Sequence, residues 1–338
     1  MKKEGIIIIQ HGDFPHDFMD EHREMFDFVG EMINQVSHKT REIEREPDDC
    51  YLADTRRIMG CFKRIGGYQH VELSYMEFVK PTIEEAVQKL EEQGVKRILF
   101  LNVLGIMMRS SHSLIDIPSI LREIREGHPD LEMTYAPPGV DFDAIADVLI
   151  KRMDSALGKH VESKKIPSGT FRNDWGVVLI AHGDVPLEYH QRSKQMETTG
   201  KHIDQWSNMV RNWPRNEEND PLHHDTIELE KHIKEKAGYE IAIGNLQFSP
   251  PTLQEALDKL TARGVKKVYF MGGTSCMGRS SHTLVDIPKA LAQLKEANPD
   301  VELEYIYPNI DQVCDDLSLM LVEKANRAIK DGENVSGF

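Results

Sequence analysis

The sequence predicts two tandem α/β lobes with flavodoxin-like architecture, each a mostly parallel sheet flanked by helices. Two observations lead to this expectation. The chain repeats itself after about 170 residues, and each copy alternates short apolar runs with longer segments of helical period. A chain of 338 residues is also too long for one ordinary core and long enough for two average domains. We therefore expect two similar lobes related by pseudo-twofold symmetry.

The repeat is clearest in one loop motif. Residues 105–118 read GIMMRSSHSLIDIP and residues 275–288 read SCMGRSSHTLVDIP, so the Arg-Ser-Ser-His and Asp-Ile-Pro elements recur after 170 residues. A His-Gly-Asp sequence ends an apolar run at residues 11–13 and again at 182–184, after 171 residues. Divergence after a duplication accounts for the net loss of one residue between these landmarks.

Each half is expected to contain four strands and five helices. The expected strands lie near 5–10, 70–78, 97–104 and 131–136, and then near 176–181, 239–248, 267–272 and 301–306. The expected helices lie near 17–36, 51–65, 81–93, 117–127 and 141–156, and then near 188–209, 224–237, 251–263, 287–297 and 309–329. Pro81 and Pro251 are expected at first helical positions, where the N–H that proline lacks is not needed.

The repeat also predicts the domain boundaries. The first lobe is expected at 1–157 and the second at 175–330. The segment 158–174, which has Lys, Ser, Pro and Gly with little periodicity, is the expected linker. The polar segments 37–50 and 210–223 occupy matching places, and we expect them to be long loops beside a functional site.

Composition excludes several classes of protein. The formal charge of −15 argues against nucleic acid as a partner, because phosphate binding needs clustered Lys and Arg. An anionic substrate would need local cations, for which Arg109 and Arg279 are candidates. No apolar run is long enough for a membrane span, and the first apolar run ends too soon for a signal peptide. A cytoplasmic location is the resulting expectation.

The four cysteines contain no CxxC pair and are expected to be reduced thiols that serve mainly in packing. Only Cys276 lies in the repeated loop, where contact with a ligand is an alternative.

Three residues of the first half are expected at the carboxyl edge of the sheet, where ligands bind in open α/β sheets. His11 ends the first strand, Glu77 lies near the end of the second, and His112 follows the third. Two imidazoles and a carboxylate suit a first-row divalent metal, and they also accept protons near neutral pH. Taken singly, each residue has an ordinary structural explanation, and Asp116 before Pro118 is typical of a helix start. The repetition of both histidines favours the joint interpretation.

The order of these motifs resembles the class II, ATP-independent sirohydrochlorin chelatases. The resemblance rests on His-Gly after an apolar strand, Glu-Phe-x-x-Pro-x-Ile-x-x-Ala, Gly-Val-x-x-Ile and His-x-x-x-Asp-Ile-Pro, and it covers both halves, as in the long two-copy form. It implies an enzyme that inserts Co²⁺, or alternatively Fe²⁺ or Ni²⁺, into sirohydrochlorin or a related tetrapyrrole, in cobalamin or siroheme biosynthesis. The metal is then a substrate, and no permanently bound cofactor is expected.

The resemblance implies that His11, Glu77 and His112 bind the metal and carry catalysis. The corresponding residues of the second half form a second candidate site: His182, Gln247 and His282. An amide cannot take up a proton as a carboxylate can and is a poorer metal ligand, so the first half is expected to be the catalytic one. The chain departs from the family in having Asp13 and Asp184 after His-Gly, where serine is usual.

Metal insertion must remove two pyrrole protons, a task for which neutral imidazoles and a nearby carboxylate are suited. The remaining residues of the loop are expected to bind the substrate. Arg109, Ser110 and Ser111 would hold its peripheral carboxylates, and Met107 and Met108 would offer apolar surface to the ring. The expected partners are a tetrapyrrole and a divalent ion. The chain is expected to be a monomer with pseudo-dimeric lobes or a homodimer.

Two other functions remain open at this point. A metal or tetrapyrrole carrier would bind its ligand in stoichiometric amounts without turnover. A metal-dependent hydrolase with the same His-Glu-His set would retain its metal through dialysis, whereas a chelatase must release it.

Overall fold

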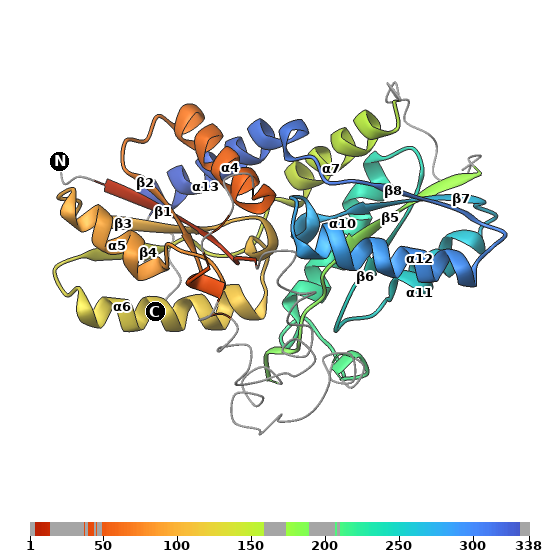
Figure 1. The fold of residues 1–338 in the computed structure, drawn as a ribbon, viewed down its shortest axis with the longest axis horizontal. Helices are drawn as coiled ribbons and strands as arrows, with labels where there is room; N and C mark the ends of the chain where they lie inside the picture. Colours follow the sequence, from red (N-terminus) through yellow and green to blue (C-terminus); the bar gives the residue numbers. More distant parts are fainter. Residues whose placement is uncertain are drawn as a thin grey trace. The chain divides into compact units, whose positions relative to one another are not determined.

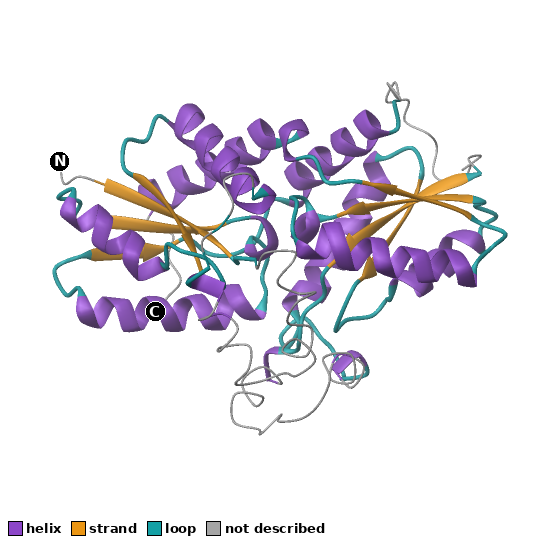
Figure 2. Ribbon diagram, viewed as in Figure 1, coloured by secondary structure: helices purple, strands orange, loops and turns teal. Residues whose placement is uncertain are grey.

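A computed structural model describes residues 4–13, 37, 40–43, 45, 49–158, 174–188, 207 and 210–331. These residues form two four-stranded parallel sheets, each with helices on both faces (Figures 1 and 2), which confirms the predicted fold class. The helices expected near 17–36 and 188–209, and most of the expected linker, lie outside the described residues. Among the described residues, no helix is long and apolar enough to cross a membrane.

The first sheet has the strand order β2-β1-β3-β4. Its strands are β1 (Glu4–Gln10), β2 (Val71–Tyr75), β3 (Arg97–Asn102) and β4 (Glu132–Tyr135). Its connecting helices are α4 (Cys50–Gly66), α5 (Ile83–Glu92) and α6 (Ile117–Gly127). The apolar run of β1 is buried because helices cover both faces of the sheet, as parallel sheets require. One face packs against α5 and α6 around Ile7, Ile9 and Phe100.

The second sheet repeats this arrangement with the order β6-β5-β7-β8. Its strands are β5 (Trp175–Ala181), β6 (Glu240–Asn245), β7 (Lys267–Gly272) and β8 (Glu302–Ile306). Its connecting helices are α10 (Pro221–Lys236), α11 (Leu253–Thr261) and α12 (Ile287–Ala297). Val178, Ile180 and Phe270 lie in the core between this sheet and α11 and α12.

The last helix of each half joins the other half's sheet. Helix α7 (Phe142–Ala156) packs against α10, and α13 (Cys314–Asp331) packs against α4 and β3. In Figure 1 the blue α13 accordingly lies beside the orange α4. Unit 1 therefore comprises residues 1–139, 197–201 and 314–338, and unit 2 comprises 140–196 and 202–313.

This exchange corrects the predicted domain boundaries at 157 and 175. The sequence repeat marks where the duplication lies, but it does not determine which core a terminal helix joins. The guanidinium of Arg152 in α7 donates to the carbonyl of Gly272 in β7 at 2.8 Å, and the ammonium of Lys324 in α13 donates to the carbonyl of Gly139 at 3.1 Å. Each of these contacts lies within one unit.

Two local expectations are also corrected. Helices α5 and α11 begin after Pro81 and Pro251, because Thr82 and Thr252 are the N-caps and form capping boxes with Glu85 and Glu255. The prolines therefore precede the caps, and both follow cis peptide bonds. The second strand ends at Tyr75, not at 78.

Candidate functional site

Backbone hydrogen bonds bring His11 and Glu77 together at the carboxyl ends of β1 and β2. The N–H of Met76 donates to the carbonyl of Gln10 at 2.9 Å, and the N–H of Glu77 donates to the carbonyl of His11 at 2.8 Å. The pairing of the two strands thus continues into the turn that carries Glu77. The Nε2 atom of His11 lies 3.9 Å from Oε2 of Glu77, and both side chains are partly exposed.

The glycine after His11 makes this approach possible. Gly12 has a φ of 104°, and a Cβ atom there would lie 1.8 Å from the carbonyl oxygen of Glu77. Only glycine fits at this distance and backbone conformation. The N–H of Gly12 donates to the hydroxyl of the buried Tyr51 at 2.9 Å, which anchors the turn to α4. Burial, reinforced by Asp13, raises the pKa of Tyr51 well above its usual range, so its hydroxyl stays neutral.

His112 reaches the same place from the loop after β3. It begins a π-helical turn, His112–Asp116, in which the N–H of Ile117 donates to the carbonyl of His112. This turn places Oδ2 of Asp116 2.8 Å from Nδ1 of His112. The sequence favoured Asp116 as a helix cap, but its carboxylate makes no capping hydrogen bond and instead orients the histidine. The rings of His11 and His112 lie 4.9 Å apart, centroid to centroid.

The hydrogen bonds of the two imidazoles determine which nitrogen faces a ligand. Nδ1 of His11 lies 2.9 Å from the carbonyl oxygen of Gly12, and Nδ1 of His112 faces the carboxylate of Asp116. Both partners are acceptors, so each Nδ1 carries the proton and each neutral ring has its lone pair on Nε2. Metal-binding histidines are commonly oriented in this way. The arrangement can bind a divalent cation or accept protons.

Unit 2 repeats this geometry with one chemical change. The rings of His182 and His282 lie 4.8 Å apart, and Nδ1 of His282 lies 2.7 Å from Oδ2 of Asp286. Gly183 again allows the close approach, because a Cβ atom there would lie 1.9 Å from the carbonyl oxygen of Gln247. Gln247 takes the place of Glu77, with its N–H donating to the carbonyl of His182 at 2.9 Å.

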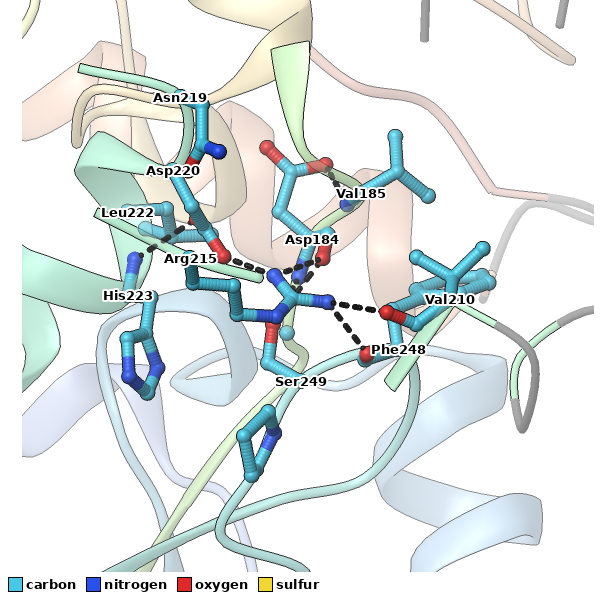
Figure 3. A network of polar contacts seen from close by, with 12 residues as sticks. Asp184, Val185, Val210, Arg215, Asn219, Asp220, Leu222, His223, Phe248 and Ser249 are labelled. Carbon is cyan, nitrogen blue, oxygen red and sulfur yellow. Dashed lines mark hydrogen bonds and ion pairs between the residues drawn. The ribbon is translucent and has the colours of Figure 1, made fainter. Parts of the chain in front are cut away.

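A buried arginine holds the turns of the unit 2 site together (Figure 3). The Arg215 guanidinium donates to the carbonyls of Asp184 at 3.1 Å and Phe248 at 2.7 Å, and pairs with the Asp220 carboxylate. It therefore links the turn after His182 to the turn after Gln247. Burial raises the pKa of Asp220 to about 6 despite the nearby guanidinium. Arg215 and Asp220 belong to the 210–223 segment, which thus contacts the turns that carry the site.

The substrate-binding residues expected in the Arg-Ser-Ser-His loop are only partly accessible. Arg109 and Arg279 are intermediate in exposure. The side chains expected to face the substrate but found buried are those of Met107, Met108, Ser110 and Ser111. The Ser110 hydroxyl bonds to Ser113 within its own loop. These four residues therefore stabilise the loop in this structure, which corrects their predicted role as a binding surface.

Several residues that support the site were not predicted. The hydroxyls of Tyr135 and Tyr305 donate to the carbonyls of Ser113 and Thr283, both at 2.9 Å, and so tie each π-helical turn to the last strand of its sheet. The two tyrosines recur after 170 residues, which was a signal in the sequence. The orienting roles of Asp116 and Asp286 carried the same signal.

Fold and sites together define a two-lobed α/β protein with one oriented histidine pair at the carboxyl edge of each sheet. A family model described as CbiX matches residues 46–156 and 219–309, which is more than half of the chain and includes parts of both units. The chain belongs to the CbiX family.

Curated relatives of known activity are similar to shorter stretches. The chain is 31% identical over 105 residues to a sirohydrochlorin ferrochelatase of Priestia megaterium, an alignment that covers 30% of this chain and 38% of that protein. It is 30% identical over 123 residues to a sirohydrochlorin cobaltochelatase of Methanopyrus kandleri, covering 30% of this chain and 85% of that protein. The chain thus spans well under half of the first relative and most of the second.

Solved structures resemble the fold over almost the whole chain. SirB from Bacillus subtilis with Fe³⁺ has a TM-score of 0.58 at 17% identity, covering 98% of this chain and all of that one. SirB from the subspecies spizizenii in complex with cobalt has a TM-score of 0.55 at 15% identity, covering 98% of both chains. At these identities, the similarity establishes the two-lobed fold.

Proposed function

We propose that this protein is a metal chelatase that inserts a divalent ion, Co²⁺ first among Co²⁺, Fe²⁺ and Ni²⁺, into sirohydrochlorin or a closely related tetrapyrrole. The observation that carries the proposal is the convergence of His11, Glu77 and His112 at one sheet edge. Relatives in both matched groups are named as sirohydrochlorin chelatases for iron or cobalt, which supports the same substrate class.

The proposed chemistry follows from the orientation of the rings. Each imidazole directs the lone pair of Nε2 away from its Nδ1 partner, so one ring binds the incoming ion while the other accepts a pyrrole proton. The carboxylate of Glu77, 3.9 Å from Nε2 of His11, stabilises the imidazolium that proton uptake creates. The carboxylate of Asp116 has the same effect on His112. Borderline nitrogen ligands suit Co²⁺, Fe²⁺ and Ni²⁺ and bind each of them.

We assign the working site to unit 1. Removing two pyrrole protons and holding a dication both favour an anionic group between the imidazoles, which Glu77 provides and the neutral amide of Gln247 does not. Because the histidine geometry of the two units is so similar, the carboxylate is the main difference on which this assignment rests. Arg109, partly exposed and three residues before His112, is the proposed partner for a peripheral carboxylate of the macrocycle.

An insertion assay tests the proposal. Purified protein, sirohydrochlorin and Co²⁺ are mixed, and the absorption spectrum of the macrocycle is followed against a protein-free control. We expect a faster spectral change with protein, repeated turnover, and activity with Fe²⁺ or Ni²⁺ in parallel runs. Stoichiometric binding of the macrocycle without turnover would overturn the assignment and indicate a carrier. A metal retained through dialysis, with no insertion, would indicate a hydrolase-type site instead.

A further inference from the structure

Unit 1 contains a pair of thiols that the proposed metal site does not use. Cys61 lies within α4, and Cys314 is the first residue of α13, 253 positions further along the chain. Their Sγ atoms are 2.7 Å apart, and both residues are buried, at 8% and 2% exposure. A disulfide bond is about 2.0 Å long, so a shift of about 0.7 Å would bring the sulfurs to bonding distance.

The two helices that carry these thiols are held together along their length. The Ser318 hydroxyl of α13 donates to the carbonyl of Ile58 in α4 at 3.4 Å, and Tyr68, just after α4, donates to Oδ1 of Asn326 at 2.7 Å. These contacts keep the two sulfurs in register. Arg64 of α4 pairs with Asp315, next to Cys314, and also hydrogen-bonds to the side chain of Cys61.

A metal site is the other use to which Cys61, Cys314 and Asp315 could be put, since their ligand atoms lie within 4.8 Å of one another. The sulfur separation argues against it. Two thiolates on one tetrahedral ion, each about 2.3 Å from the metal, would be about 3.7 Å apart. The observed 2.7 Å is much closer to a bond than to that arrangement. The carboxylate of Asp315 is moreover largely exposed and paired with Arg64.

We propose that Cys61 and Cys314 are a redox-active pair that forms a disulfide and locks α13 onto α4 in unit 1. The oxidant is a hydroperoxide. The two thiols give up two protons and two electrons as the S–S bond forms, and the O–O bond of the hydroperoxide breaks to yield one alcohol and one water, or two waters from hydrogen peroxide. A thiol reductant reverses the step by exchange. This inference does not rest on the proposed metal insertion.

The position of the pair gives the bond a structural consequence. Cys314 is the residue at which the chain passes from unit 2 back into unit 1. A bond at this position fastens the exchanged helix where it enters its unit. Cys61 is the more exposed sulfur and contacts the Arg64 guanidinium, which favours a negative sulfur, so it is the expected site of first attack. Burial raises the pKa of Cys314 to about 12, so the bond should form slowly at neutral pH and faster at higher pH.

The test uses the full-length wild-type protein. It is exposed to hydrogen peroxide at pH 7 and pH 8.5, the remaining thiols are alkylated, and a non-reducing digest is analysed by mass spectrometry. We expect one cross-linked peptide pair that contains Cys61 and Cys314, with Cys50 and Cys276 alkylated as internal controls. The midpoint of thermal unfolding should rise by about 5 °C and return after reduction.

Two substitutions complete the design. Cys314→Ser should abolish the cross-link and the thermal shift, whereas Cys50→Ser should retain both. Alkylation of all four cysteines after peroxide treatment of the wild-type protein would overturn the proposal, and so would a cross-link between other cysteines. Protection of Cys61 and Cys314 that requires added Co²⁺, with a thiolate-to-cobalt absorption band, would assign the pair to metal binding instead.

Discussion

In both units a histidine at the end of the first strand faces a histidine in a π-helical turn, with ring centroids 4.9 Å apart in unit 1 and 4.8 Å apart in unit 2. In both, a carboxylate four residues along orients the second histidine. The group beside the first histidine differs, because Glu77 in unit 1 corresponds to Gln247 in unit 2. The duplication has thus preserved the geometry of the histidine pair and changed its charge and proton-accepting capacity.

The two units also stabilise their first turn differently. In unit 1 the Tyr51 hydroxyl accepts from the N–H of Gly12. In unit 2 the Ser249 hydroxyl accepts from the N–H of Asp184, and Arg215 spans the carbonyls on either side. The same backbone conformation is therefore supported by different side chains, which indicates that the conformation itself is what both units need. Substitutions matched between the units test this comparison.

Loss of a histidine is expected to have the largest effect. His112→Ala in unit 1 should lower the rate of cobalt insertion by about 10³-fold, since it removes a metal ligand and a proton acceptor together. The matched variant His282→Ala should retain most of the activity. Initial rates from the macrocycle spectrum measure both. Equal losses in the two variants would show that both units are needed.

Exchange of the carboxylate and the amide tests the comparison more finely. Glu77→Gln should lower the insertion rate by about 10²-fold with little effect on folding, because the side chains have nearly the same shape. Gln247→Glu should give unit 2 the same ligand set and strengthen its binding of Co²⁺ by about tenfold, as measured by calorimetry. If Glu77→Gln retained full activity, the assignment of the working site to unit 1 would fail.

The two glycines are expected to be equally intolerant of a side chain. Gly12→Ala and Gly183→Ala should each lower the free energy of unfolding by on the order of 3 kcal/mol, because the new Cβ meets a carbonyl oxygen at a positive φ. Denaturant unfolding measures this loss. Only Gly12→Ala should also reduce insertion by the fraction that stays folded, because it separates His11 from Glu77. A neutral Gly183→Ala would contradict the close approach in unit 2.

A smaller effect is expected in the pH dependence of stability. The pKa of Asp220 is raised from 3.8 to about 6, so between these values the folded protein binds more protons than the unfolded chain. The contribution of Asp220 to stability should therefore decrease as pH rises from about 4 to about 6, by on the order of 2 kcal/mol. Denaturant titrations of wild type and Asp220→Asn across this range isolate the effect. Parallel curves for the two proteins would exclude it.

Local patterns explain why much of the fold was predictable. Strands such as Lys267–Gly272 and helices such as Ile117–Gly127 were expected at their observed bounds, because an apolar run and a helical period are properties of neighbouring residues. His11, Glu77 and His112 could be placed at one sheet edge for a related reason. In a parallel sheet every strand ends on the same side, so residues that follow strands are brought together.

Contacts between distant residues account for what was missed. The roles of Asp116 and of the buried Met107 and Met108 depend on a π-helical turn and on packing that periodicity does not encode. The apolar face of α13 indicated that the helix packs, but not that it packs on the first sheet, and the proximity of Cys61 and Cys314 follows from that choice.

The sequence by itself determined the duplication, the two parallel sheets, the histidine pairs and the loss of the carboxylate in the second copy. These features are written in residue identities and local spacing. The tertiary structure decided the exchange of the last helices, the orientation of each imidazole and the pairing of two cysteines 253 positions apart. Each of these depends on which surfaces meet when the chain collapses, and the free energy of that packing is not a property of any short segment.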